Sequence, residues 1–313
     1  MTLRASTAVL AALAIAMPVL AKAPSPEQAD IAVRAGEAVD MTINDQPMRF
    51  RLAPDAISVP TINADAAARA GLKPSMIGYI YVIGPEKIAF RTDNVRYGPR
   101  DASFRRRTAF SDRQLVSGAD GIAGPEAFPA ARTTFVLRDP RPDDRAVTFP
   151  LDREMGRSQT SVRLDVGGRP IYAAFSLDRA ESLVTATGGR WIADANGGQF
   201  SGVARAAPIL YGVSRPVRPL ELARPLMLGE LEIRNLAVRV SDMGSAEGIA
   251  EGASAEQDPN EIVVTGDSKR KVPNQRLYIG MDTIGHCASI TYDFAAGTVT
   301  LMCPAQPRSA APR

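Results

Sequence analysis

An internal repeat at a spacing of 123 residues constrains the fold of this chain more than any other feature. The run VDMTINDQPMRFRLAPDAIS, which starts at Val39, aligns without gaps on VRLDVGGRPIYAAFSLDRAE, which starts at Val162. In both copies apolar residues alternate with polar ones up to a turn-rich pair and a proline, and an aspartate follows, Asp55 or Asp178. Such alternation is typical of half-buried strands. The two copies therefore predict two similar β units.

The repeat extends toward the C-terminal end of each copy. Glycine-containing segments around Gly124 (GIAGPEAF) and Gly280 (YIGMDTI) each lead into a predicted hairpin, TTFVLRDPRPDDRAVTFPL in the first copy and ASITYDFAAGTVTLMC in the second. These segments are 156 residues apart, so the second copy has gained 33 residues. The segment 243–275 has that length and is rich in Gly, Ala, Ser and charged residues, which predicts a mobile insertion.

This order of elements resembles that of the retropepsin-like and pepsin-like aspartic proteases in a tandem, two-lobed form. The resemblance covers about Gly36 to Cys303 and rests on the order of the motifs in both copies. It implies an all-β fold of two acid-protease-like β-barrel lobes, related by a pseudo-twofold axis, with a cleft between them. The expected lobes are residues 24–155 and 156–306, followed by a flexible tail at 307–313.

In this family each lobe supplies an Asp-Thr-Gly loop, and the two aspartates share a proton while they activate a water molecule. Counting back from the AARAGL segment places Ala53 and Ser176 at the aspartate positions, with Asp55 and Asp178 at the glycine positions. On this register the catalytic pair is lost. The resemblance then implies a degenerate pseudo-protease that binds a peptide or protein ligand in the cleft.

A register shifted by two residues makes Asp55 and Asp178 themselves the catalytic pair, and the chain is then an active aspartic endopeptidase. Neither loop would contain a glycine, and Arg179 beside Asp178 would hold that carboxylate ionised and oppose proton sharing. In a third interpretation each aspartate caps a turn and does no chemistry. All three alternatives remain open at the level of the sequence.

The segment Gly78–Gly84 (GYIYVIG) lies where the family has its flap, the hairpin that closes over a bound peptide. In that position Tyr79 and Tyr81 would contact an extended peptide that adds itself as a strand. The alternative is an ordinary apolar strand.

The first 23 residues have the pattern of a signal peptide. A basic start (MTLR) precedes a short apolar run, and small residues lead to a cleavage point near Ala21 or Ala23. A retained membrane anchor is the alternative, although the apolar run is short for a bilayer span. We expect an exported protein, periplasmic or secreted, with no stable membrane anchor.

The only two cysteines, Cys287 and Cys303, flank the second predicted hairpin. This hairpin is expected to bring their sulfurs together as a disulfide in an oxidising compartment, with two buried free thiols as the alternative. Two thiols and the single histidine, His286, fall short of a closed zinc site. We therefore expect no metal and no cofactor.

Charge and one short motif bear on the partners. The net charge of +3, without a repeated basic face, argues against a nucleic-acid partner. Within the predicted insertion, Glu261–Gly266 (EIVVTG) resembles a segment near the start of the plug of TonB-dependent outer-membrane receptors, which pairs as a strand with a periplasmic partner. The alternative is a brief β-prone strand.

Overall fold

The structure is a computed structural model that describes residues 30–152, 159–241 and 275–305. The predicted signal peptide, the tail and the segment Glu261–Gly266 lie outside these ranges, and only Gln275 of the predicted insertion is described. The protein is mostly β, with 54% strand and 10% helix, which confirms the all-β class. Within the described ranges, every helix is too short or too polar to cross a bilayer.

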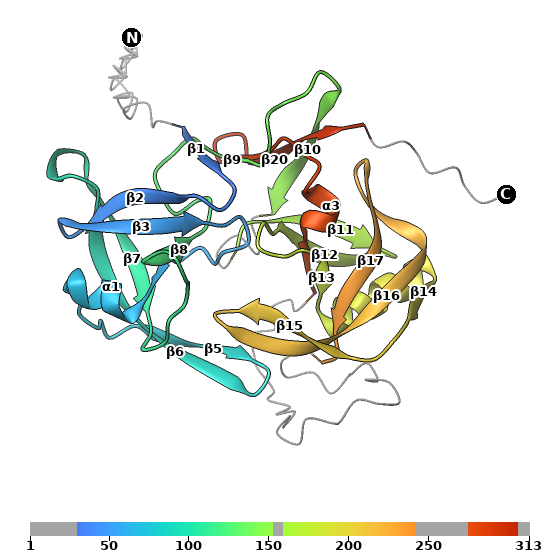
Figure 1. Cartoon of the computed structure of the whole chain (residues 1–313), viewed down its shortest axis with the longest axis horizontal. Coiled ribbons are helices and arrows are strands. Elements are labelled where there is room, and N and C mark those ends of the chain that lie inside the picture. Colours follow the sequence, from blue (N-terminus) through green and yellow to red (C-terminus); the bar gives the residue numbers. More distant parts are fainter. Residues whose placement is uncertain (1–29, 153–158, 242–274, 306–313) are drawn as a thin grey trace, which may run out of the picture.

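Seven strands of the N-terminal half form one sheet: β2 (Ala38–Ile43), β3 (Gln46–Leu52), β4 (Thr61–Ile62), β5 (Gly78–Ile83), β6 (Glu86–Tyr97), β7 (Phe104–Phe110) and β8 (Gly121–Ala123). Their order is β2-β3-β8-β4-β7-β6-β5, and they lie on the left of Figure 1. β2 and β3 meet at the turn Asn44-Asp45, where both φ angles are positive, a conformation that Asn and Asp tolerate. β2 also pairs with β6 through Ile43 and Tyr97, so six strands close into a barrel.

The C-terminal half contains a corresponding set of strands: β11 (Ser161–Val166), β12 (Arg169–Phe175), β13 (Leu183–Val184), β15 (Arg205–Leu210), β16 (Val213–Leu228), β17 (Leu231–Arg239) and β18 (Arg276–Ile279). They pair in the order β11-β12-β18-β13-β17-β16-β15, which matches the first sheet strand for strand. The directions match as well, since β12–β18 and β13–β17 are parallel, like β3–β8 and β4–β7. A further strand, β14 (Gly198–Phe200), pairs with β16.

The repeat spacing found in the sequence recurs in the strand register. After a shift of 123 residues, β2 and β3 begin and end at the same positions as β11 and β12. Phe50 pairs with Gly121 in the first half, and Ala173 pairs with Leu277 in the second. Ala173 is 123 residues after Phe50, and Leu277 is 156 residues after Gly121, so both spacings of the repeat are reproduced. The two copies of the repeat therefore have the same strand pairing in this region.

Strands from both halves also join in one sheet across the top of Figure 1: β1 (Ile31–Arg34), β9 (Arg132–Val136), β10 (Asp144–Asp152), β19 (Ser289–Asp293) and β20 (Thr298–Pro304). Their order is β1-β9-β19-β20-β10, and β10 continues the sheet into β11. β19 and β20 form the hairpin predicted at the C-terminal end. The predicted disulfide between Cys287 and Cys303 is confirmed.

The hairpin predicted for the end of the first half is wrong. β9 pairs with β1 and β19, and β10 pairs with β20 and β11. The connection between β9 and β10 contains Pro140 and Pro142, which have no N–H to donate to a ladder. Both strands instead complete their hydrogen bonding with the other half of the chain.

Three short α-helices and a 3₁₀ turn complete the described elements: α1 (Ala64–Arg69), α2 (Ala186–Asn196), α3 (Met281–Ile284) and η1 (Arg100–Ala102). α1 follows β4 and α2 follows β13, as the repeat requires. The largest apolar core cluster contains buried residues of both halves, among them Phe50 and Phe175. A smaller cluster around Ile83, Phe90 and Tyr211 also contains residues of both halves.

Candidate functional site

A cavity of about 610 Å³ lies between the two halves of the chain. Arg51, Asp55 and the segment 114–117 line it from the N-terminal half, and the segments 178–181 and 207–212 line it from the C-terminal half. Its volume is typical of ligand pockets, which measure about 300–1,000 Å³. The two aspartates singled out in the sequence thus line one cavity that both halves share.

Asp55 lies on the loop after β3, and only 12% of its side chain is exposed. Burial raises the pKa of the Asp55 carboxyl above its ordinary value of 3.8. The Ser176 hydroxyl and the Arg179 guanidinium oppose this rise, whereas the negative charge of Asp178 adds to it. The two carboxylates are therefore close enough to interact electrostatically.

Each aspartate has an arginine partner from the opposite half. Arg51 Nη2 lies 3.1 Å from Asp178 Oδ2, and Arg179 Nε lies 3.9 Å from Asp55 Oδ2. Arg51 belongs to β3, whereas Arg179 follows Asp178 in the chain, so the two ion pairs cross between the halves. Arg179, expected from the sequence to act on its neighbour Asp178, pairs instead with Asp55.

Arg179 also holds the β15–β16 hairpin. Its Nη1 donates to Pro208 O at 2.7 Å, and its Nη2 donates to Ile209 O. The guanidinium carbon lies 4.8 Å from the centroid of the Tyr278 ring, which is a cation–π contact. Because only 11% of this side chain is exposed, Arg179 forms a buried link between Asp55 and the hairpin.

Ala53 and Ser176, the positions where the family motif has its aspartates, are both buried. Their backbone N–H groups donate to corresponding carbonyls, Ala53 to Ala123 at 3.0 Å and Ser176 to Ile279 at 2.8 Å. Within the described residues the Ser176 hydroxyl makes no hydrogen bond of ordinary geometry, but it is close enough to favour the ionised form of Asp55. The two loops thus share one backbone anchor and carry no carboxylate at the motif position.

The two glycine segments pack on these aspartate-bearing loops. A Cβ placed on Gly280 would lie 2.5 Å from the carbonyl carbon of Glu181, a distance that real side chains do not adopt. A Cβ on Gly124 would lie 3.2 Å from Ala56 O. Glycine is therefore required after β18, and a larger residue is disfavoured at the matching position after β8.

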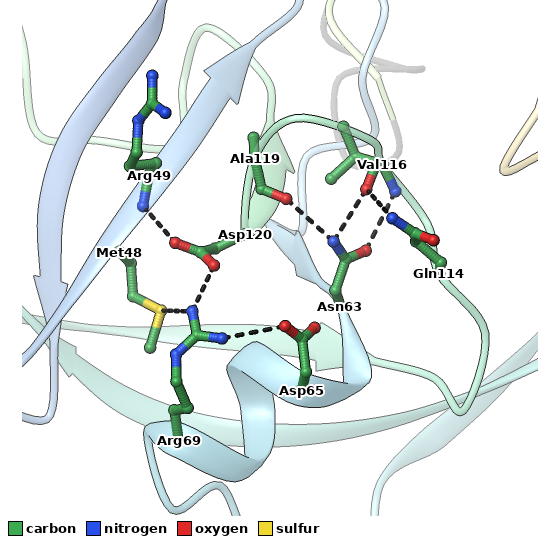
Figure 2. A network of polar contacts seen from close by, with 9 residues as sticks. All are labelled: Met48, Arg49, Asn63, Asp65, Arg69, Gln114, Val116, Ala119 and Asp120. Atoms are coloured by element: carbon green, nitrogen blue, oxygen red, sulfur yellow. Dashed lines mark hydrogen bonds and ion pairs between the residues drawn. The ribbon is translucent and has the colours of Figure 1, made fainter.

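Figure 2 shows the network that fixes one wall of the cavity. Asn63, just before α1, donates from its amide to Val116 O at 2.9 Å and to Ala119 O at 3.0 Å. Its side-chain oxygen accepts from the N–H groups of Leu115 (2.8 Å) and Val116 (3.1 Å). One buried amide thus makes four hydrogen bonds to the backbone of this loop and holds it against α1.

The end of the same loop is held by charge, as Figure 2 also shows. Asp120 accepts from Arg49 N at 2.8 Å and from the Arg69 guanidinium. Arg69 also donates to Asp65 at 3.0 Å, one turn earlier on α1. The loop is therefore tied to β3 and α1 at the point where β8 begins.

Tyr79 and Tyr81, the predicted flap residues, pack in the smaller apolar cluster and are not among the residues that line the cavity. Tyr79 stacks on Phe90 with ring centroids 4.9 Å apart, and Tyr81 meets Tyr211 edge-on at 5.9 Å. Burial raises the pKa of Tyr81 to about 12 and that of Tyr79 further above its ordinary value. Both phenols are therefore neutral at physiological pH.

His286, Cys287 and Cys303 place potential metal-ligand atoms within 4.8 Å of one another. The two sulfurs are bonded to each other in the disulfide. Since zinc is bound by thiolates rather than by a disulfide, the oxidised form of this cluster offers only the imidazole as a conventional ligand.

Sequence reasoning missed the role of Arg51. It lies between the apolar residues Phe50 and Leu52, which in a strand of period two predicts an exposed side chain. At the repeat spacing its counterpart is Ala174. The two copies thus differ at this position, with a long cationic residue in the first and a small apolar one in the second. This difference is the signal that could have identified Arg51 as a candidate site residue.

A scan against protein-family models found no match, and neither did a search of curated proteins.

Proposed function

We propose that this chain is an exported aspartic-protease-like protein that binds an extended peptide or protein segment between its halves and has lost peptide-bond hydrolysis. The observation that carries the proposal is the crossed pairing of Arg51 with Asp178 and of Arg179 with Asp55. In an aspartic protease the two carboxylates share one proton and act on one water molecule. Carboxylates that each face an arginine are poorly suited to share a proton with each other.

The matching strand orders support two lobes, residues 24–155 and 156–306, related by a pseudo-twofold axis. The pairing of β9 with β19 supports the same arrangement. Arg132 pairs with Asp293 and Val136 pairs with Ser289, so each strand lies antiparallel to its own counterpart in the repeat. This mutual pairing is what a twofold axis between two like units produces.

The lining of the cavity suits a polypeptide. Apolar side chains such as Leu115, Ile122 and Ile209 surround the two arginines and two aspartates. Apolar walls with a few convergent polar groups are typical of ligand sites, and charged groups hydrogen-bond readily to the amides of an extended chain.

Binding can be tested with fluorescein-labelled α-lactalbumin that has been reduced and carboxymethylated so that it stays unfolded. Ala180 is exposed and lines the cavity, whereas Ala68 is exposed on α1 and does not. We expect saturable binding by fluorescence anisotropy for the unmodified protein and for Ala68→Trp, with a loss of about tenfold or more for Ala180→Trp because the indole fills the cavity. An absence of saturable binding by the unmodified protein would contradict the proposal.

One observation favours the second candidate, an active endopeptidase that uses Asp55 and Asp178. Burial raises the pKa of Asp55, and a general acid must hold its proton. Cleavage of the same polypeptide at acid pH that is lost in both Asp55→Asn and Asp178→Asn would support this candidate and overturn the first. Cleavage that persists in both variants would identify a contaminating protease.

Export is part of the proposal. The Cys287–Cys303 disulfide is compatible with an oxidising compartment. N-terminal sequencing of the mature protein from an expressing cell should find a start near Lys22 or Pro24, after cleavage near Ala21 or Ala23. Recovery of the chain with an intact Met1 would argue against this. The strand-pairing partner of Glu261–Gly266 stays a prediction.

A further inference from the structure

The turn of the β15–β16 hairpin contains an unusual residue. Tyr211 and Gly212 both have positive φ angles, 53° and 76°. Two other hairpins of this chain have the same kind of turn, and their residues are Asn44-Asp45 and Gly167-Gly168, which tolerate it. A tyrosine is strained in this region because its Cβ crowds the backbone. The conformation of the turn therefore does not explain why a tyrosine occupies this position.

The contacts of the Tyr211 side chain do explain it. The residue is only 6% exposed, and its ring centroid lies 5.3 Å from that of Phe90 and 5.9 Å from that of Tyr81. Phe90 and Tyr81 belong to β6 and β5 of the N-terminal sheet. Figure 1 shows β15 extending from the C-terminal half toward β5. The tip of the hairpin is thus inserted into the apolar cluster of the opposite half.

The same hairpin closes one side of the cavity. Its residues 207–212 line the cavity, and Arg179 holds the carbonyls of Pro208 and Ile209. A Cβ placed on Gly84, in the turn of the β5–β6 hairpin, would lie 2.3 Å from Arg215 Cζ on β16. The two hairpins are therefore in close contact, and β15 and its turn occupy one side of the cavity.

We propose that the β15–β16 hairpin is a tethered competitor for the ligand site. Tyr211 occupies an aromatic pocket formed by Tyr81 and Phe90, and a bound polypeptide displaces the hairpin and places an aromatic side chain of its own there. The strain at Tyr211 is relieved when the tip leaves, which lowers the cost of displacement. The apparent association constant for the ligand is then the intrinsic constant multiplied by the fraction of molecules whose hairpin is undocked. This inference rests on the proposed function.

Three variants test it. Tyr211→Gly and Tyr211→Asn remove the ring and introduce residues that this turn favours, whereas Tyr211→Phe keeps the ring and is the matched control. The probes are two synthetic ten-residue peptides that differ only in a central tyrosine or alanine. We expect the Gly and Asn variants to bind the tyrosine peptide about tenfold or more tightly than the unmodified protein does, with little gain for the alanine peptide. Tyr211→Phe keeps the ring in place but loses the interaction of the phenol with the Thr61 hydroxyl, so it should bind the tyrosine peptide more weakly than the Gly and Asn variants do.

Each outcome decides a separate point, with folding checked by circular dichroism and thermal melting. Equal or weaker binding of the tyrosine peptide by folded Gly and Asn variants, beside saturable binding by the unmodified protein, overturns the competitor role and leaves peptide binding standing. Binding of that peptide by these two variants but not by the unmodified protein supports the inference. An equal gain for both peptides overturns the aromatic pocket. Binding by none of the proteins overturns the inference together with the proposed function.

Discussion

The side-chain hydroxyls of Thr134 and Thr291 lie 3.0 Å apart across the antiparallel β9–β19 pair. Thr291 is 157 residues after Thr134, and the whole of β19 follows β9 at this spacing. This offset is one residue longer than the 156 residues that separate Gly124 from Gly280, and it places Thr134 and Thr291 at equivalent positions of β9 and β19. Each threonine therefore faces the equivalent position of the other strand, which is where a twofold axis between the two halves would pass.

The losses of unfolding free energy caused by replacing these two threonines should not be additive. Thr134→Val leaves the part-buried Thr291 hydroxyl without this partner, and we expect a loss of about 1 kcal/mol in unfolding free energy. Adding Thr291→Val removes the second polar group, so the double variant should lose less than the sum of the two single variants. Denaturant unfolding of all four proteins measures this coupling, and strictly additive losses would show that the hydroxyls do not interact.

Asp55 should make stability depend on pH. Since burial raises its pKa above 3.8, the folded protein binds this proton more strongly than the unfolded chain does. The contribution is complete below 3.8 and is lost as the pH rises through the raised pKa, at about 1.4 kcal/mol per pH unit across that window.

The matching variant is Asp55→Asn, whose unfolding free energy should fall less over the same window than that of the unmodified protein. Asp40→Asn, at an exposed position on β2, is the control and should keep the original profile. Denaturant unfolding at a series of pH values measures all three proteins. Parallel profiles for the unmodified protein and Asp55→Asn would show that this carboxyl does not titrate differently in the folded state.

The disulfide should contribute substantially to stability. Cys287 and Cys303 are 16 residues apart, and closing a loop of this size stabilises a protein by about 3 kcal/mol. We expect the Cys287→Ala, Cys303→Ala double variant to lose that amount in denaturant unfolding and to be insensitive to added reductant. A double variant as stable as the oxidised parent would contradict this.

Asn63 should be essential for the cavity wall. Asn63→Ala leaves four backbone hydrogen-bonding groups of the adjoining loop without their partner, and we expect a loss of about 2–4 kcal/mol in unfolding free energy. Binding of the unfolded polypeptide should weaken as well, because this loop lines the cavity. Asn94→Ala, at an exposed position on β6, is the control and should change stability by less than about 0.5 kcal/mol.

The sequence predicted those parts of the fold that local patterns specify. β2 and β3 were recoverable because two gapless copies show the same alternation and the same turn. The pairing of β9 was not predicted from the sequence, because its partners β1 and β19 are distant in the chain. Neighbouring strands pair by default, so a hairpin with β10 was expected instead. The Cys287–Cys303 pair was predictable because a short local hairpin brings the two residues together.

The candidate site divides in the same way. Asp55 and Asp178 were found because the repeat preserves them. Arg51 was not identified, and Arg179 was expected to act on Asp178 rather than on Asp55, because long side chains that cross between two halves leave no periodic signal. The docking of Tyr211 depends on a left-handed turn that sequence rules assign to Asn or Gly, so its position required the structure.

The most direct test of the central claim, that the cleft binds a polypeptide without cutting it, is the mass of the bound ligand. The labelled, unfolded α-lactalbumin is incubated with a stoichiometric amount of the protein from acid to neutral pH, and its intact mass is then measured by mass spectrometry. We expect it to be bound in the anisotropy measurement and recovered at full length at every pH. Fragments that form with the unmodified protein and disappear with both Asp55→Asn and Asp178→Asn would contradict the claim.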